Sequence, residues 1–151
     1  MTGDRLGPVL FAYDGSDLAK VAIEEAGRQL APDRHAVVLT VWRPYAVEFI
    51  PARGLQFDAA ATDDVRRAAE VTAADGAALA EAAGFRSESM SLHAAPTWKG
   101  ISRIAEERDA DLIVLGSHGR SGLRGALTGT VAGAIAVHSS RPVLIVHKPH
   151  H

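Results

Sequence analysis

Three glycines and a threonine at fixed spacing are the residues of this chain best suited to bind a ligand. Gly116 and Gly119 are followed, after nine residues, by Gly129 and Thr130. An apolar run at 111–115 precedes them and is typical of a buried strand, and residues 130–137 are typical of a helix. A glycine-rich loop between a strand and a helix N-terminus favours binding of phosphate. The backbone can approach the anion closely, and free N–H groups and the helix dipole attract negative charge.

Side chains of the same loop could add charge and hydroxyl groups. Arg120 and Arg124 have the planar shape that suits phosphate, but a loop arginine can equally be a solvated surface residue. His118 would contribute if protonated, and Thr130 could cap the helix or donate its hydroxyl to a phosphate oxygen. The candidate ligand-binding residues of this segment are Gly116, Ser117, His118, Gly119, Arg120, Gly122, Gly129, Thr130 and Val131.

A second polar segment follows the first apolar run. Residues 8–13 predict a strand, and Asp14, Gly15 and Ser16 then form a turn and helix-start signal. Asp14 could serve a ligand site at the strand end, or only close an Asx turn. Ser16 is expected to cap the next helix rather than act as a nucleophile, because no G-x-S-x-G motif surrounds it.

The order of elements predicts an α/β fold. Strands are expected at 8–13, 36–42, 87–93, 112–115 and 142–147, with helices at 17–31, about 63–83, 97–108 and 130–137. Strands alternating with helices indicate a single open, doubly wound parallel sheet of five strands. Thr97 is expected to cap the third helix, and Glu106, Glu107 and Asp109 to form a solvated helix end.

Ligands of such sheets bind beyond the carboxyl ends of the strands, where the strand order reverses. Residues 14–16 follow the first strand, and residues 116–130 follow the fourth. If those strands are neighbours, the two segments face each other across one crevice.

Composition excludes several other classes of protein and site. The 151 residues contain no cysteine, which rules out disulfides and thiolate sites and fits a cytoplasmic protein. The formal net charge of −2 gives no overall attraction to nucleic acid or membrane, and no apolar run is long enough to span a bilayer. Neither a P-loop motif nor a Rossmann glycine motif is present, and the histidines lack metal-ligand spacing.

These motifs together resemble the universal stress protein family. Its nucleotide-binding members carry Gly, two residues, Gly, nine residues, Gly and then Ser or Thr, which here are Gly116, Gly119, Gly129 and Thr130. Residues 14–16 resemble the family's N-terminal signature, and 110–123 and 141–146 its C-terminal block. The resemblance covers nearly the whole chain, and it identifies residues 1–151 as a single universal stress protein domain.

The resemblance implies an adenine nucleotide alpha hydrolase-like fold with strand order 3-2-1-4-5. It implies ATP, with Mg²⁺, between strands one and four, and a homodimer. The residues themselves predict where two copies pair, because the expected fifth strand is an edge strand with Val143 and Ile145 at alternate positions. It places Asp14 near the ribose or the metal–phosphate end, Val41 at the adenine through its backbone, and Ala12 close by. Ala132 departs from the family pattern, because many relatives carry a second hydroxyl residue there.

Three functions remain open from the sequence. The first is a nucleotide-responsive regulator in stress adaptation that binds ATP. The second is a slow ATPase or another adenine-nucleotide hydrolase. The third is an interaction protein without a ligand, which the complete glycine motif disfavours and Ala132 weakly favours.

Overall fold

The computed structural model describes residues 6–43, 59–118 and 130–148. Its sheet is parallel with the order β3-β2-β1-β4-β5, as the family resemblance implies. The strands are β1 (Val9–Ala12), β2 (His35–Trp42), β3 (Arg86–His93), β4 (Leu112–Gly116) and β5 (Val143–Val146). The helices are α1 (Asp17–Gln29), α2 (Ala59–Ala82), α3 (Thr97–Glu107) and α4 (Val131–His138). The predicted element order is therefore confirmed.

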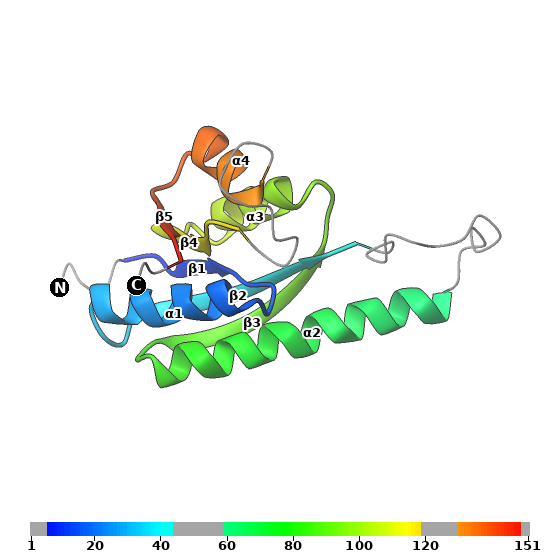
Figure 1. The fold of residues 1–151 in the computed structure, drawn as a ribbon, viewed down its shortest axis with the longest axis horizontal. Helices are drawn as coiled ribbons and strands as arrows, with labels where there is room; N and C mark the ends of the chain where they lie inside the picture. The colour runs from blue at the N-terminus through cyan, green and yellow to red at the C-terminus, as the bar shows by residue number, and fades with distance from the viewer. Residues whose placement is uncertain (1–5, 44–58, 119–129, 149–151) are drawn as a thin grey trace.

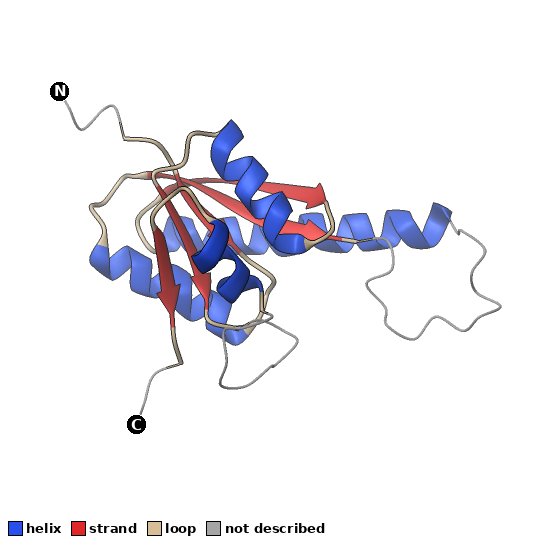
Figure 2. Ribbon diagram, turned by 90° about the horizontal axis from the view of Figure 1, so that it is seen from above, coloured by secondary structure: helices blue, strands red, loops and turns tan. Residues whose placement is uncertain are grey.

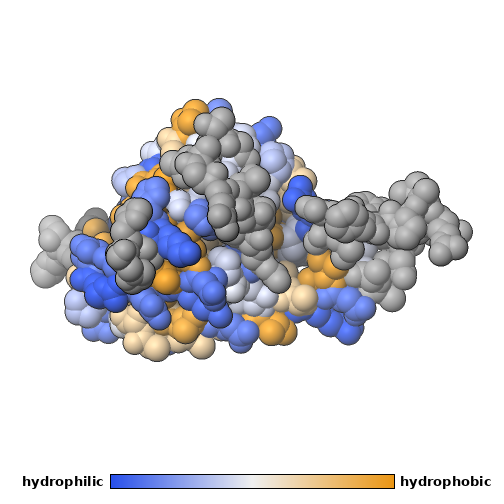
Figure 3. Space-filling model, in the orientation of Figure 1, coloured by the Kyte–Doolittle hydropathy of each residue, from blue (hydrophilic) through white to orange (hydrophobic). Residues whose placement is uncertain are grey.

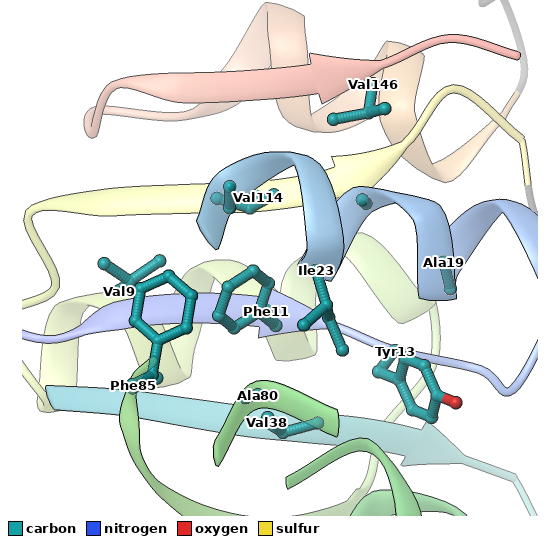
Figure 4. Packing of buried hydrophobic residues seen from close by; sticks show 13 residues of the cluster. Val9, Phe11, Tyr13, Ala19, Ile23, Val38, Ala80, Phe85, Val114 and Val146 are labelled. Atoms are coloured by element: carbon teal, nitrogen blue, oxygen red, sulfur yellow. The ribbon is translucent and has the colours of Figure 1, made fainter. Parts of the chain in front are cut away.

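Helices cover both faces of the sheet, α1 and α2 on one side and α3 and α4 on the other (Figure 1). Alternate residues of β1 enter two different cores: Phe11 packs with Ile23 of α1, and Leu10 packs with Ile101 of α3. Because both faces are buried, the central strands are continuous apolar runs. Figure 4 shows the first core, in which the rings of Phe11 and Phe85 pack edge to face with their centroids 5.3 Å apart.

The strand order reverses beside β1. The chain passes from β1 to β2 and β3 on one side, and then returns to place β4 on the other side of β1. Figure 2 shows the strands fanning apart toward their carboxyl ends. The expectation that the ends of the first and fourth strands are neighbours is thus confirmed.

The ladder between β1 and β2 stops at Tyr13. The Tyr13 N–H donates to the Leu39 carbonyl at 2.9 Å. The Tyr13 carbonyl accepts the buried hydroxyl of Thr40 at 2.8 Å. Beyond this point β1 leaves the sheet toward α1, while β2 continues to Trp42.

Two helix starts agree with the sequence and one does not. The Ser16 hydroxyl accepts the Ala19 N–H, and the Thr130 hydroxyl accepts the Gly133 N–H, so both residues are N-caps. The prediction that Thr97 caps α3 is wrong. The cap position belongs to Pro96, whose extended backbone precedes the helix and which provides no side-chain hydrogen bond, so Thr97 is already the first helical residue.

The end of α3 is solvated as expected, with the side chains of Glu106 53% and Asp109 88% exposed, and it also forms an ion-pair cluster. The Arg141 guanidinium donates to both Glu106 carboxylate oxygens, at 2.9 and 3.2 Å, and to Asp109 at 2.8 Å. It also donates to the Ala110 carbonyl at 2.9 Å. This arginine, only 21% exposed, thereby joins the end of α3 to the start of β5. Glu107 instead pairs along the helix with Arg103.

We predict that Glu106→Gln flattens the pH dependence of stability between about pH 4.5 and 2. Hydrogen bonds from Arg141, then Ser140, lower the Glu106 pKa from 4.5 to about 2. A carboxylate with a depressed folded-state pKa contributes stability that is present above its unfolded pKa and is lost as pH falls through its folded value. Urea unfolding across this range measures the effect. Glu107→Gln is the matched control, because it removes a carboxylate from the same helix end without touching Arg141. Equal slopes in the two variants would contradict the prediction.

No helix in the described ranges is long and apolar enough to cross a membrane.

Candidate functional site

A cavity of about 630 Å³ opens over the carboxyl ends of β1, β2 and β4. This volume lies within the range of small-molecule sites, about 300–1,000 Å³. Its floor includes Ala12, Leu39 and Leu115, from the three strands in turn. The cavity therefore lies at the reversal of strand order, where ligands of open α/β sheets bind.

Three helices begin at this cavity. Ser16 before α1, Thr97 of α3 and Thr130 before α4 all line it. The first turn of a helix has unpaired N–H groups and carries roughly half a positive charge, so each start favours an anion. The charged side chains of the described lining are Asp14 and Arg43, which offset each other. Attraction for phosphate would therefore come mainly from backbone dipoles.

The turn after β1 needs its glycine. The Asp14 carboxylate accepts the Ser16 N–H at 2.9 Å, which forms the Asx turn considered from the sequence. Gly15 has a φ of +83°, a conformation that residues with a Cβ rarely adopt. Asp14 also lines the cavity, so turn formation and a ligand role are compatible at this position.

Gly116 allows α1 to pack closely against the end of β4. A Cβ on Gly116 would lie 2.9 Å from Leu18 Cγ, which is closer than carbon atoms can approach without displacement. The glycine at this position is thus required by helix–strand packing as well as suited to a ligand loop.

Val41 has backbone hydrogen-bonding groups beyond the point where β1 departs. Leu39 pairs toward β1, because its carbonyl accepts the Tyr13 N–H, and Trp42 pairs toward β3, because its carbonyl accepts the Ala94 N–H. Alternation along a strand therefore turns the N–H and C=O of Val41 toward the β1 side. Within the described ranges neither group has a hydrogen-bond partner. Val41 lines the cavity, where it offers one donor and one acceptor side by side.

The phenol of Tyr13 closes one side of the cavity in its neutral form. Burial, followed by the nearby carboxylates of Asp75 and Asp14, raises the pKa of Tyr13. The ring is 4% exposed and packs against the α1/α2 face. A neutral phenol places no further negative charge beside an incoming phosphate.

The structure brings most of the described candidate residues to the cavity. Those that line it are Ala12, Asp14, Val41, Gly116, His118, Thr130 and Val131. Gly15 forms the adjacent turn, and Ser117 is buried, with its N–H on the Val146 carbonyl and its hydroxyl 3.3 Å from His118 Nδ1. The candidates outside the described residues are Gly119, Arg120, Gly122 and Gly129.

Sequence reasoning missed one wall of the cavity. Four residues of α2 line it: Val65, Ala68, Ala69 and Thr72. No local signal indicates this contribution, because α2 reaches the site only through its packing against the sheet. Thr40 and Arg43 also line the cavity, and so does Trp42, for which the sequence favoured a packing role over stacking on a base. Their position next to Val41, at the end of an expected strand, is the sequence feature that could have indicated a place in the site.

Comparison with known proteins settles the family. The model of the universal stress protein family matches residues 6–147. The chain belongs to the universal stress protein family. Among the relatives of this universal stress protein is MJ0531 of Methanocaldococcus jannaschii, 28% identical over 93% of this chain and 82% of the relative. Rv2005c of Mycobacterium tuberculosis is 31% identical over 92% of this chain but only 44% of its own length.

Solved structures agree with the fold. The hypothetical protein MJ0577 of Methanocaldococcus jannaschii superposes with a TM-score of 0.78 at 22% identity, over 96% of this chain and 98% of that chain. A universal stress protein in complex with cAMP gives a TM-score of 0.66 at 26% identity, over 94% of this chain and 97% of that chain. The universal stress protein from Archaeoglobus fulgidus in complex with dAMP gives a TM-score of 0.61 at 20% identity, over 93% of this chain and 97% of that chain. Universal stress proteins of this fold thus include nucleotide-bound members.

We expect Thr130→Val to lower the free energy of unfolding by about 1 kcal/mol, the usual cost of losing a helix cap. Valine keeps the shape of threonine but removes the oxygen that accepts the Gly133 N–H at 3.0 Å. Thr130→Ser keeps that oxygen and should retain most of the stability. Urea unfolding of the two variants measures this difference, and equal stability of the serine and valine variants would show that the cap is unimportant.

Proposed function

We propose that this universal stress protein binds an adenine nucleotide, with ATP as the ligand, and acts as a nucleotide-responsive regulator in stress adaptation. The observation that carries the proposal is the donor and acceptor of Val41 beside a cavity at which three helices begin. An adenine edge presents an adjacent donor and acceptor, which matches one strand residue. The phosphates would extend toward Thr130 and the start of α4.

The complexes of family members with cAMP and dAMP support the ligand class. In this chain Ala12 would lie close to the base, and Asp14 near the ribose or the metal–phosphate end. Gly116, His118, Thr130 and Val131 would surround the phosphates, together with Gly119, Arg120, Gly122 and Gly129.

Magnesium fits as a companion of the nucleotide. The described residues contain no group of three or more His, Cys, Asp or Glu side chains suited to a metal. Mg²⁺ commonly takes one or two carboxylates together with substrate phosphates and water. The described lining contains one carboxylate, that of Asp14, so the ion would arrive with the triphosphate.

Binding without fast turnover fits this lining better than hydrolysis. The Asp14 carboxylate already accepts the Ser16 N–H, and the described lining contains no second carboxylate that could activate a water molecule. We therefore propose a regulator, with slow ATP hydrolysis as the alternative. We also propose a cytoplasmic location, which the lack of cysteine favours.

We predict that Ala68→Trp weakens ATP and AMP binding more than tenfold, because a large ring on this exposed residue of α2 would occupy the cavity that Ala68 lines. Ala78→Trp is the matched control, since Ala78 is exposed on the same helix and does not line the cavity. Isothermal titration calorimetry measures both. No heat of binding with the folded parent protein at high concentration would refute the proposed function.

The free edge of β5 is the surface proposed for homodimer formation. The Ile113 N–H donates to the Pro142 carbonyl, and the Ser117 N–H donates to the Val146 carbonyl. The backbone groups of residues 142, 144 and 146 therefore face β4. The backbone groups of Val143 and Ile145 therefore point away from β4, at an edge suited to pairing with a second copy. Nearby α4 adds Val137, which is exposed. Figure 3 shows a hydrophobic patch at the top of the molecule, where Figure 1 places α4.

We expect Ile145→Pro to convert a dimer to a monomer at micromolar concentration, as measured by light scattering. Proline removes an N–H at the free edge and leaves the β4 ladder intact, a position where strands tolerate proline. Circular dichroism must show that the variant is folded. A monomeric parent protein, or a variant that stays dimeric, would contradict pairing through β5.

A further inference from the structure

The indole of Trp42 lies at the cavity beyond the proposed adenine position. Trp42 lines the cavity and is half-buried. Its ring stacks on the ring of His93, with centroids 4.9 Å apart and planes 24° from parallel. These residues are direct register partners across β2 and β3. The histidine therefore braces one face of the indole.

The opposite side of the indole is the side available to a ligand. Trp42 lines the cavity and His93 does not, so the indole is the ring of this stacked pair that faces the cavity. Side chains alternate along a strand, which puts Trp42 on the same sheet face as Val38, the face that α1 and α2 cover. Ala68 and Ala69 of α2 line the cavity on that face, and their small side chains leave room beside the ring.

We propose that Trp42, held in place by His93, is the stacking surface for the nucleotide base. This inference rests on the proposed function and deepens it: the site selects ligands that carry an aromatic base over sugar phosphates or inorganic polyphosphate. Val41 would pair with the edge of the base, and the next residue, Trp42, would cover its face. An edge contact and a face contact from consecutive residues define the position of a planar ring in both directions.

Trp98 provides an internal comparison. It too stacks on a histidine, His138, with centroids 4.5 Å apart and planes 15° from parallel. Trp98 does not line the cavity. A purely structural role of indole–imidazole stacking would make the two tryptophans equivalent, whereas a ligand role belongs to Trp42 alone.

The chain contains two tryptophans, so Trp98→Phe leaves Trp42 as the sole indole fluorophore. In this background we expect AMP to change the fluorescence of Trp42 in a saturable way. Ribose 5-phosphate, which lacks the base, should leave the emission unchanged. A saturable AMP binding isotherm by calorimetry with no change in emission would place the base away from Trp42 and overturn the inference.

Affinity gives an independent readout. Trp42→Leu should weaken AMP binding about tenfold, within the range for loss of one base–aromatic stack. The affinity of the Trp42→Leu variant for inorganic tripolyphosphate should equal that of the parent protein. The Trp42→Phe variant should recover most of the AMP affinity. His93→Ala should weaken AMP binding less than Trp42→Leu, because it only frees the ring to move.

Each failure has its own meaning. Parent-level AMP affinity in Trp42→Leu overturns the stacking role while nucleotide binding stands. An equal loss of AMP and tripolyphosphate affinity in a folded Trp42→Leu variant shows general disruption of the site and also overturns it. If the parent protein binds no AMP, the proposed function fails together with this inference.

Discussion

The hydrogen bond from the Thr40 hydroxyl to the Tyr13 carbonyl is the interaction on which the site depends. In a regular parallel ladder that carbonyl would receive the N–H of Val41. Here a buried side chain satisfies it at 2.8 Å, and β1 turns away into the Asp14 turn. Two consequences follow. A cavity opens at the end of β1, and Val41 retains backbone groups that a ligand can use.

The topology adds the second feature of the site. This feature is a positive electrostatic potential at the cavity of a protein that is not basic overall. Parallel strands connected by helices bring helix N-termini to the carboxyl edge of the sheet, and the starts of α1, α3 and α4 meet the cavity. The chain carries a formal charge of −2 overall. A polyanion would therefore be held by oriented backbone dipoles, whose effect is strongest within the first turn of each helix. Such an arrangement gives local affinity without general attraction to nucleic acid.

The sequence predicted what depends on local patterns. The buried strand before Gly116, the caps at Ser16 and Thr130 and the alternation of strands and helices each have a local signal, and the structure confirms them. The strand order itself came from the family resemblance, because periodicity does not say which strands are neighbours. Its confirmation also establishes that the ends of β1 and β4 meet.

Features made by distant segments could not be predicted in this way. The acidic end of α3 is solvated as the sequence predicts, but its ion pairs depend on the fold, which brings Arg141 to Glu106 from 35 residues away. The contribution of α2 to the cavity likewise depends on tertiary packing, since its alanine-rich pattern does not show which elements it will pack against. The sequence favoured a packing role over base stacking for both Trp42 and Trp98, and only the structure separates them by placing Trp42 at the cavity.

A crystal structure of the protein grown with AMP tests the central claim most directly. The account predicts electron density for the base at the end of β2, with its edge within hydrogen-bonding distance of both the N–H and the carbonyl of Val41. Density for the nucleotide elsewhere, or a cavity filled by the protein's own side chains at saturating AMP, would contradict it.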